Sequence, residues 1–275
     1  MRQSRHRLLL LSSILGSLAL GWALPDQTRA EWYAGAYGGV SLGGRITDGS
    51  LPIYGQNQAQ ALFPNPSPSR GDYTASTFSL NDSIKLKNSA MFGGRVGYFF
   101  NAYGYPWAGL EVEAFTTQPD IKQQTVPYTN GILSNRQIIV TPAQPQSTVV
   151  NSTVPIGEST LRVTTVALNA VVRYPGKVFQ PYAGVGVGLF YFQGTSSFQG
   201  NLTFTPGDPP LKFDGNDLQP GLNTFAGMKY FFSDKVALFG EYKYNRATIN
   251  RLDDVFGLKG NYSIMHVLGG VAYHF

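Results

Sequence analysis

The chain has 275 residues, of which 43% are hydrophobic and 13% are charged, and it contains no cysteine. The lack of cysteine excludes a disulfide framework and thiol chemistry. Residues 1–30 hold four of the 21 basic residues and one of the 16 acidic residues, so residues 31–275 carry 17 minus 15, or +2, which gives no argument for a nucleic-acid partner.

The first thirty residues predict a secretory signal peptide. Three arginines near the start precede an apolar run at 8–20, and Thr28-Arg29-Ala30 then forms a small-x-small cleavage motif. A retained membrane anchor is the alternative, but the apolar run is shorter than the ~20 residues that a transmembrane helix needs. We therefore expect a cleaved signal peptide at 1–30 and an exported domain at 31–275.

Eight later segments alternate apolar and polar residues with the period of two that is typical of β-strands. They are 32–43, 90–100, 107–117, 161–174, 181–193, 222–232, 236–247 and 262–275. Each is long enough for the ~9–11 residues with which a tilted strand crosses a bilayer. The pattern predicts an all-β fold, an eight-stranded antiparallel up-and-down transmembrane β-barrel.

The connections between these segments alternate in length. Short connections follow the second, fourth and sixth strands, whereas the others are long, at about 45–89, 118–160, 194–221 and 248–261. Short turns on the periplasmic side and long loops outside are typical of outer-membrane barrels. A ten-stranded barrel that uses the second long connection is the alternative. The apolar stretches there are too short to span lipid, so we expect a hairpin above the membrane.

Charged residues lie on one face of the predicted strands. Leu110 and Val112, for example, alternate with Glu111 and Glu113. A soluble lipocalin-type barrel keeps its apolar face inside. Here the nearly uncharged face must meet lipid, because a Lys or Arg facing the bilayer midplane costs ~2–4 kcal/mol. Tyrosine, tryptophan and phenylalanine near the strand ends predict an aromatic girdle at the periplasmic interface, with Trp32, Tyr98, Phe100, Tyr103, Tyr105, Trp107, Tyr174, Tyr182, Tyr230, Phe232, Tyr273 and Phe275.

The inward charges form the main candidate site, an interior ionic network. Its members are Arg95, Glu111, Glu113, Arg173, Lys229, Glu241 and Lys243. An eight-stranded barrel is just wide enough for side chains to fill, and an unpaired buried charge is costly. We therefore expect ion pairs that plug the lumen, with a gate or narrow solute path as the alternative. Strand order makes Arg95–Glu111 and Lys229–Glu241 the candidate pairs.

Few residues of the exported part suggest catalysis or metal binding. His266 and His274 are its only histidines, and Ser263 falls on the opposite strand face from His266. No catalytic pair is therefore predicted, and we expect His266 to be an interior polar residue. Three aspartates of the third long connection fit turn formation better than a calcium site, namely Asp208, Asp214 and Asp217. We predict no metal and no cofactor.

Several strand motifs resemble the OmpA/OmpX-type eight-stranded outer-membrane barrel family. They are Trp32-Tyr33-Ala34-Gly35, Gly109-Leu110-Glu111-Val112, Phe225-Ala226-Gly227-Met228-Lys229-Tyr230, Phe239-Gly240-Glu241-Tyr242 and the closing Gly270-Val271-Ala272-Tyr273-His274-Phe275. The resemblance covers the strands and none of the long connections. It implies a place in the outer membrane, contact with its lipid and lipopolysaccharide, and recognition of Phe275 by the barrel-assembly machinery. The peptidoglycan-binding domain of the OmpA type is not implied, because the sequence ends with the barrel.

Together these features predict a non-enzymatic outer-membrane surface protein with a structural role or a role in binding through its long loops. The external ligand is not identified by the sequence. A narrow channel for small solutes or ions is one alternative, and a lipid-modifying outer-membrane enzyme is a less favoured one.

Overall fold

The computed structural model describes residues 31–63, 73–135, 146–195, 214–254 and 256–275, so the expected signal peptide lies outside the described residues. The elements in this part of the chain are β1(Glu31–Ser50), α2(Pro52–Leu62), β2(Thr74–Leu80), β3(Ile84–Lys85), β4(Ser89–Phe100), the 3-10 turn η2(Asn101–Tyr103), β5(Tyr105–Thr117), β6(Gln124–Ser134), β7(Gln146–Ile156), β8(Thr160–Arg173), β9(Phe179–Thr195), β10(Gly215–Phe231), β11(Val236–Ile249) and β12(Lys259–His274). Within these residues, no helix has the length and apolar character to cross a membrane.

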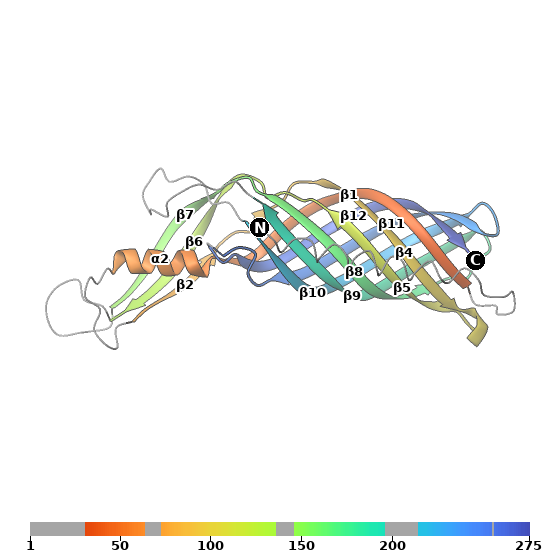
Figure 1. Cartoon of the computed structure of the whole chain (residues 1–275), viewed down its shortest axis with the longest axis horizontal. Helices are drawn as coiled ribbons and strands as arrows, with labels where there is room; N and C mark the ends of the chain where they lie inside the picture. The colour runs from red at the N-terminus through yellow and green to blue at the C-terminus, as the bar shows by residue number, and fades with distance from the viewer. Residues whose placement is uncertain (1–30, 64–72, 136–145, 196–213, 255) are drawn as a thin grey trace, which may run out of the picture.

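Eight strands close into a ring, as predicted (Figure 1). The antiparallel order is β1, β4, β5, β8, β9, β10, β11 and β12, and β12 pairs back with β1. Each strand contains nearly all of its predicted segment. β1 and β10 extend beyond the predicted limits, to Ser50 and from Gly215, so the barrel wall continues above its apolar part and the third long connection is shorter than expected.

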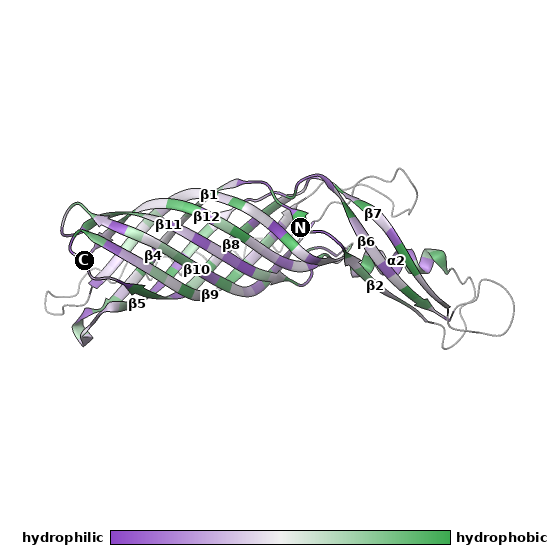
Figure 2. Ribbon diagram, turned by 180° about the vertical axis from the view of Figure 1, so that it is seen from behind, coloured by the Kyte–Doolittle hydropathy of each residue, from purple (hydrophilic) through white to green (hydrophobic). Residues whose placement is uncertain are grey.

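The two faces of the ring differ in the predicted sense. Large apolar side chains such as Phe92, Val187 and Leu168 lie more than half exposed on the outer wall. Arg95 and Lys243 are buried inside. Figure 2 shows the resulting alternation of apolar and polar residues along the barrel strands. The inside-polar arrangement excludes a lipocalin-type interior in the middle of this ring.

A separate sheet extends beyond one end of the ring (Figure 1). It has the order β2-β6-β7, and β6 and β7 form the expected hairpin. This hairpin does not join the ring, so the ten-stranded alternative is wrong. Helix α2, which the sequence analysis did not predict, packs on the sheet through Gly55 and Ala59. We call α2, β2, β6 and β7 the extension.

An apolar cluster, which was not predicted from the sequence, fills the extension end of the ring. Phe192 of β9 lies 5.1 Å from Tyr262 of β12, between ring centroids, although these strands are not neighbours. The contact therefore spans the lumen. We call the barrel residues of this cluster the apolar cap; they are Ile46, Leu161, Val163, Phe190, Phe192, Ala247, Ile249, Tyr262 and Ile264.

Candidate functional site in the barrel interior

Arg95 lies at the centre of an ion cluster in the lumen. Its Nη1 and Nη2 donate to Glu241 Oε2 and Oε1 at 2.7 and 3.0 Å, a bidentate pair between β4 and β11. Nη1 is also 3.5 Å from Glu111 Oε2, and Nη2 is 3.7 Å from Glu113 Oε2. The predicted Arg95–Glu111 contact is thus present, but the shortest pair joins non-adjacent strands across the barrel.

Lys243 and three tyrosines complete the coordination of these carboxylates. Lys243 Nζ lies 2.5 Å from Glu113 Oε2 and 3.6 Å from Glu241 Oε1. Each carboxylate also accepts a hydrogen bond from a buried phenol: Glu111 from Tyr33 at 2.6 Å, Glu113 from Tyr37 at 3.0 Å and Glu241 from Tyr182 at 2.8 Å. Two cations and three phenols therefore hold three buried carboxylates, which offsets part of their desolvation cost.

Tyr182 does not belong to the aromatic girdle, so its predicted place there is wrong. It is only 6% exposed and points into the lumen. The alternation of β9 explains the error, because Val185 and Val187 lie on the outer wall and Tyr182 therefore falls on the inner face.

Lys229 is separate from the ion cluster. In the register of β10 and β11 it lies opposite Phe239, so the predicted Lys229–Glu241 pair is wrong. Its Nζ has no hydrogen-bond partner among the described residues and lies 3.8 Å from the centroid of the Tyr33 ring. A cation over the face of an aromatic ring is electrostatically favourable, so this contact stabilises the buried ammonium.

Arg173 belongs to a second, smaller ion layer at the short-turn end of the ring. Its Nη1 and Nη2 contact Glu31 at 2.8 and 2.5 Å, and His274 Nδ1 contacts the same carboxylate. Glu31 was not among the residues predicted for the interior network. Its position two residues before the inward Tyr33 was the available signal, because the strand period places both on one face.

His266 lies between the ion cluster and the apolar cap in a chain of polar side chains. Its Nδ1 is 2.8 Å from Ser41 Oγ, and its Nε2 is 2.8 Å from Asn245 Oδ1. A serine, a histidine and an amide in this order are spaced as in nucleophilic hydrolases. Ser41 and His266 are nevertheless fully buried and face away from the outer wall, so a lipid substrate has no access to them.

The remaining predicted residues do not assemble into a site. Among the described residues, no group of three or more His, Cys, Asp or Glu could hold a metal ion. Asp208 lies outside the described residues, and Asp217 accepts hydrogen bonds from the backbone N–H groups of Asn250 and Arg251 at 2.8 and 3.2 Å. The backbone N–H of Phe275 donates to Trp32 at 2.9 Å, and its role as an assembly signal stays a prediction.

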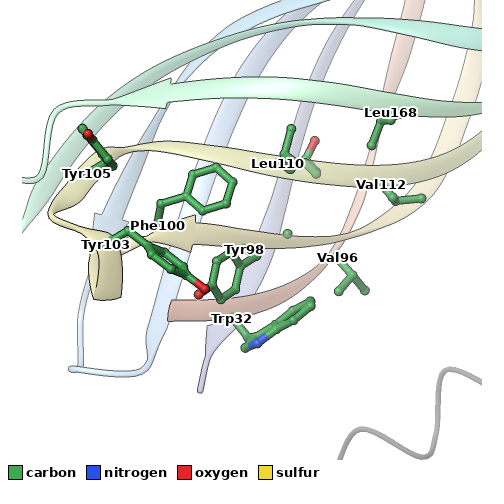
Figure 3. A pocket seen from close by; sticks show the side chains of 11 residues that line it. Trp32, Val96, Tyr98, Phe100, Tyr103, Tyr105, Leu110, Val112 and Leu168 are labelled. Carbon is green, nitrogen blue, oxygen red and sulfur yellow. The ribbon is translucent and has the colours of Figure 1, made fainter. Parts of the chain in front are cut away.

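An apolar groove of about 840 Å³ lies on the outer wall near the short-turn end (Figure 3). Trp32, Tyr98 and Leu110 line it on the barrel wall, and Phe100 and Tyr103 border it near the η2 turn. Trp32 and Tyr98 lie side by side, with ring centroids 5.0 Å apart. We call the band of exposed apolar side chains around the outer wall the apolar belt. The groove belongs to this belt and its aromatic girdle rather than to the charged interior.

Comparison with known proteins places the chain in a family. Residues 51–275 match the model of the outer membrane protein beta-barrel domain. The chain belongs to this family. It is accordingly an outer-membrane protein. That the short turns face the periplasm and the extension faces outward stays a prediction. No curated protein matches the chain.

Several solved outer-membrane proteins are similar to this family member at low identity. Neisserial surface protein A (NspA) is 12% identical, with 90% of this chain and 99% of that chain covered and a TM-score of 0.43. OprG from Pseudomonas aeruginosa is 15% identical, with 90% and 96% covered and a TM-score of 0.40. Ail, the attachment invasion locus protein of Yersinia pestis, is 11% identical, with 90% and 98% covered and a TM-score of 0.37.

Proposed function

We propose that this outer-membrane barrel is a non-enzymatic surface protein that presents its extension to an external partner. The observation that carries the proposal is that the extension is a packed structure. Phe78 and Tyr128 stack with ring centroids 4.6 Å apart, and both belong to the apolar cluster that continues into the barrel cap. A sheet held in this way loses little conformational entropy when it binds a partner, which favours recognition.

The exposed face of the extension favours a neutral, hydrogen-bonding partner. β2, β6 and β7 contain no charged residue. Thr77, Thr125 and Thr153 are exposed, and Thr129 donates to Asn151 at 2.8 Å between β6 and β7. Hydroxyl and amide groups on a rigid surface suit a partner rich in the same groups, because each can donate and accept.

The interior supports a structural role rather than conduction. Moving along the lumen from the periplasmic end, a solute would meet the Arg173–Glu31 pair, then the Arg95 cluster, then the apolar cap. In each layer, side chains contact one another across the ring. This filling is expected for an eight-stranded barrel.

The proposal is tested with the full-length protein in lipid nanodiscs, applied to an array of neutral and acidic oligosaccharides and peptides. We expect binding to neutral members. Thr77→Lys and Thr153→Lys on the exposed sheet face should abolish it, while Lys177→Thr at the periplasmic end should leave it unchanged. Equal binding by all variants, or binding to acidic members alone, would refute the assignment of the sheet face.

A further inference from the structure

A row of exposed cations crosses the outer wall of the barrel on one side. Arg246 of β11 lies opposite Ser263 of β12, and Ser263 lies opposite Arg45 of β1. Arg45 in turn lies opposite Lys85 of β3. The backbone N–H of Lys122 donates to the Lys85 carbonyl at 3.1 Å, which places Lys122 at the end of the same row. We call these four cations the basic row.

The basic row follows directly on the apolar belt. On β11, Arg246 is the next outward residue after Tyr244. On β1, the strand is apolar on its outer face up to Leu42, and Arg45 follows after a register shift. The outward part of β1 from Trp32 to Leu42 has the length that crosses the hydrocarbon core. The basic row therefore lies at the extracellular interface of the membrane.

The charge of the basic row is not neutralised by the described residues. None of its members forms an ion pair with them. The neighbouring acid Asp48 accepts hydrogen bonds from Thr47 and Asn261, and Glu158, beyond the Lys122 end, is 2.5 Å from Lys87. On the opposite side of the ring, the belt ends on uncharged hydroxyls: Thr116 and Thr164 lie 3.3 Å apart. The next outward residue of β8 is the exposed cation Arg162, which lies opposite the uncharged Gln193 of β9, so the basic row differs in bringing several cations together on neighbouring strands.

We propose that the basic row binds the phosphate groups of lipopolysaccharide in the outer leaflet. Opposite residues on neighbouring strands have Cβ atoms about 4.5–5.5 Å apart, so adjacent long side chains can reach one phosphate. Arginine binds phosphate oxygens in a bidentate manner, and lysine adds a point charge. The acyl chains of the same lipid lie against the apolar belt below. This inference concerns the barrel wall and does not depend on the proposed role of the extension.

The experiment titrates the full-length protein, in zwitterionic detergent micelles, with fluorescent bisphosphorylated lipid A. Arg45→Ser, Lys85→Ser and Arg246→Ser are combined in one variant, since serine already occupies the row at Ser263. A cation near an anionic membrane surface contributes about fivefold in affinity, so we expect the triple variant to bind roughly 100-fold more weakly. Wild-type affinity should also fall as salt concentration rises.

The control removes two exposed cations at the short-turn end of the barrel, with Lys177→Ser and Lys235→Ser, and it is compared with the row double variant Arg45→Ser with Arg246→Ser. The control should retain wild-type affinity and heat-modifiable gel migration. Equal weakening in the two double variants would mean a general charge effect and would overturn the proposal. Equal wild-type affinity for dephosphorylated lipid A would assign binding to the acyl chains. Competition by equimolar inorganic phosphate would assign the row to a soluble anion.

Discussion

The charged side chains inside the barrel balance one another only when Lys229 is counted together with both ion layers. In their usual charge states, Arg95 and Lys243 face three carboxylates in the central cluster, which leaves one negative charge. At the short-turn end, Arg173 is matched by Glu31, and Lys229 adds one positive charge. Lys229 therefore acts as the counter-charge of the cluster without touching a carboxylate.

The bidentate Arg95–Glu241 pair should be a large contributor to barrel stability. Glu241→Gln leaves Arg95 with weaker partners in a dry interior, and we expect a loss of ~3–5 kcal/mol in the free energy of unfolding. Asp234→Asn, the same chemical change in an exposed turn, should stay within about 0.5 kcal/mol of wild type. Urea unfolding in lipid bilayers measures both. Similar small losses for the two variants would contradict the expectation.

A pair of double-mutant cycles distinguishes contact from charge balance. Arg95→Met and Glu241→Gln should show a coupling energy of ~1–3 kcal/mol, because the two side chains share two hydrogen bonds. Lys229→Met combined with Glu241→Gln should show a smaller coupling, because Lys229 lies opposite Phe239. The same unfolding measurement gives both values. A larger coupling for the Lys229 cycle would favour the pair that the sequence predicted and would contradict the structure.

At the scale of elements, the sequence predicted the eight barrel strands well and the extension poorly. The strands can be recognised in the sequence, because lipid on one side and polar side chains on the other impose a strict alternation of apolar and polar residues. Helix α2 carries almost none. It presents Gly55 and Ala59 to the sheet rather than a stripe of large apolar residues, so its position depends on a tertiary fit.

The pairing of the interior charges could be predicted only in part, because it depends on the geometry of the closed barrel. The strand period assigned Arg95, Glu111 and Lys243 to the inner face, but it does not give register or contacts across the lumen. The Arg95–Glu241 pair connects β4 to β11, which are not neighbours in the ring. Only closure of the barrel brings these side chains together.

The fit of α2 on the sheet gives a test of the extension. A Cβ atom at Gly55 would lie 2.6 Å from both Phe78 Cβ and Ser76 Oγ. Gly55→Val should therefore displace α2 and raise the rate of proteolysis within the extension, while the barrel keeps its heat-modifiable gel migration. Gln60→Val, on the exposed side of α2, introduces the same side chain and should leave proteolysis unchanged. Equal proteolysis of the two variants would contradict this packing.

At the scale of the whole molecule, the filled lumen predicts a closed barrel. Planar bilayers containing the protein should show no steady single-channel openings, because the ion layers and the apolar cap block the path. A large porin reconstituted in the same way provides the positive control. Steady openings whose conductance changes in Glu111→Gln would show that ions pass the cluster and would favour the channel alternative.

The seam between β1 and β12 has a consequence for the time course of folding. It joins Tyr33 to His274 and Val40 to Val267, so its contacts are among the longest in sequence separation that the chain makes. Such contacts form slowly, since a long loop must close before they contribute. Until then both seam strands present unpaired backbone groups to any other chain nearby. Refolding should therefore lose yield steeply as chain concentration rises, and the interval before ring closure is when the protein most needs protection from its own copies.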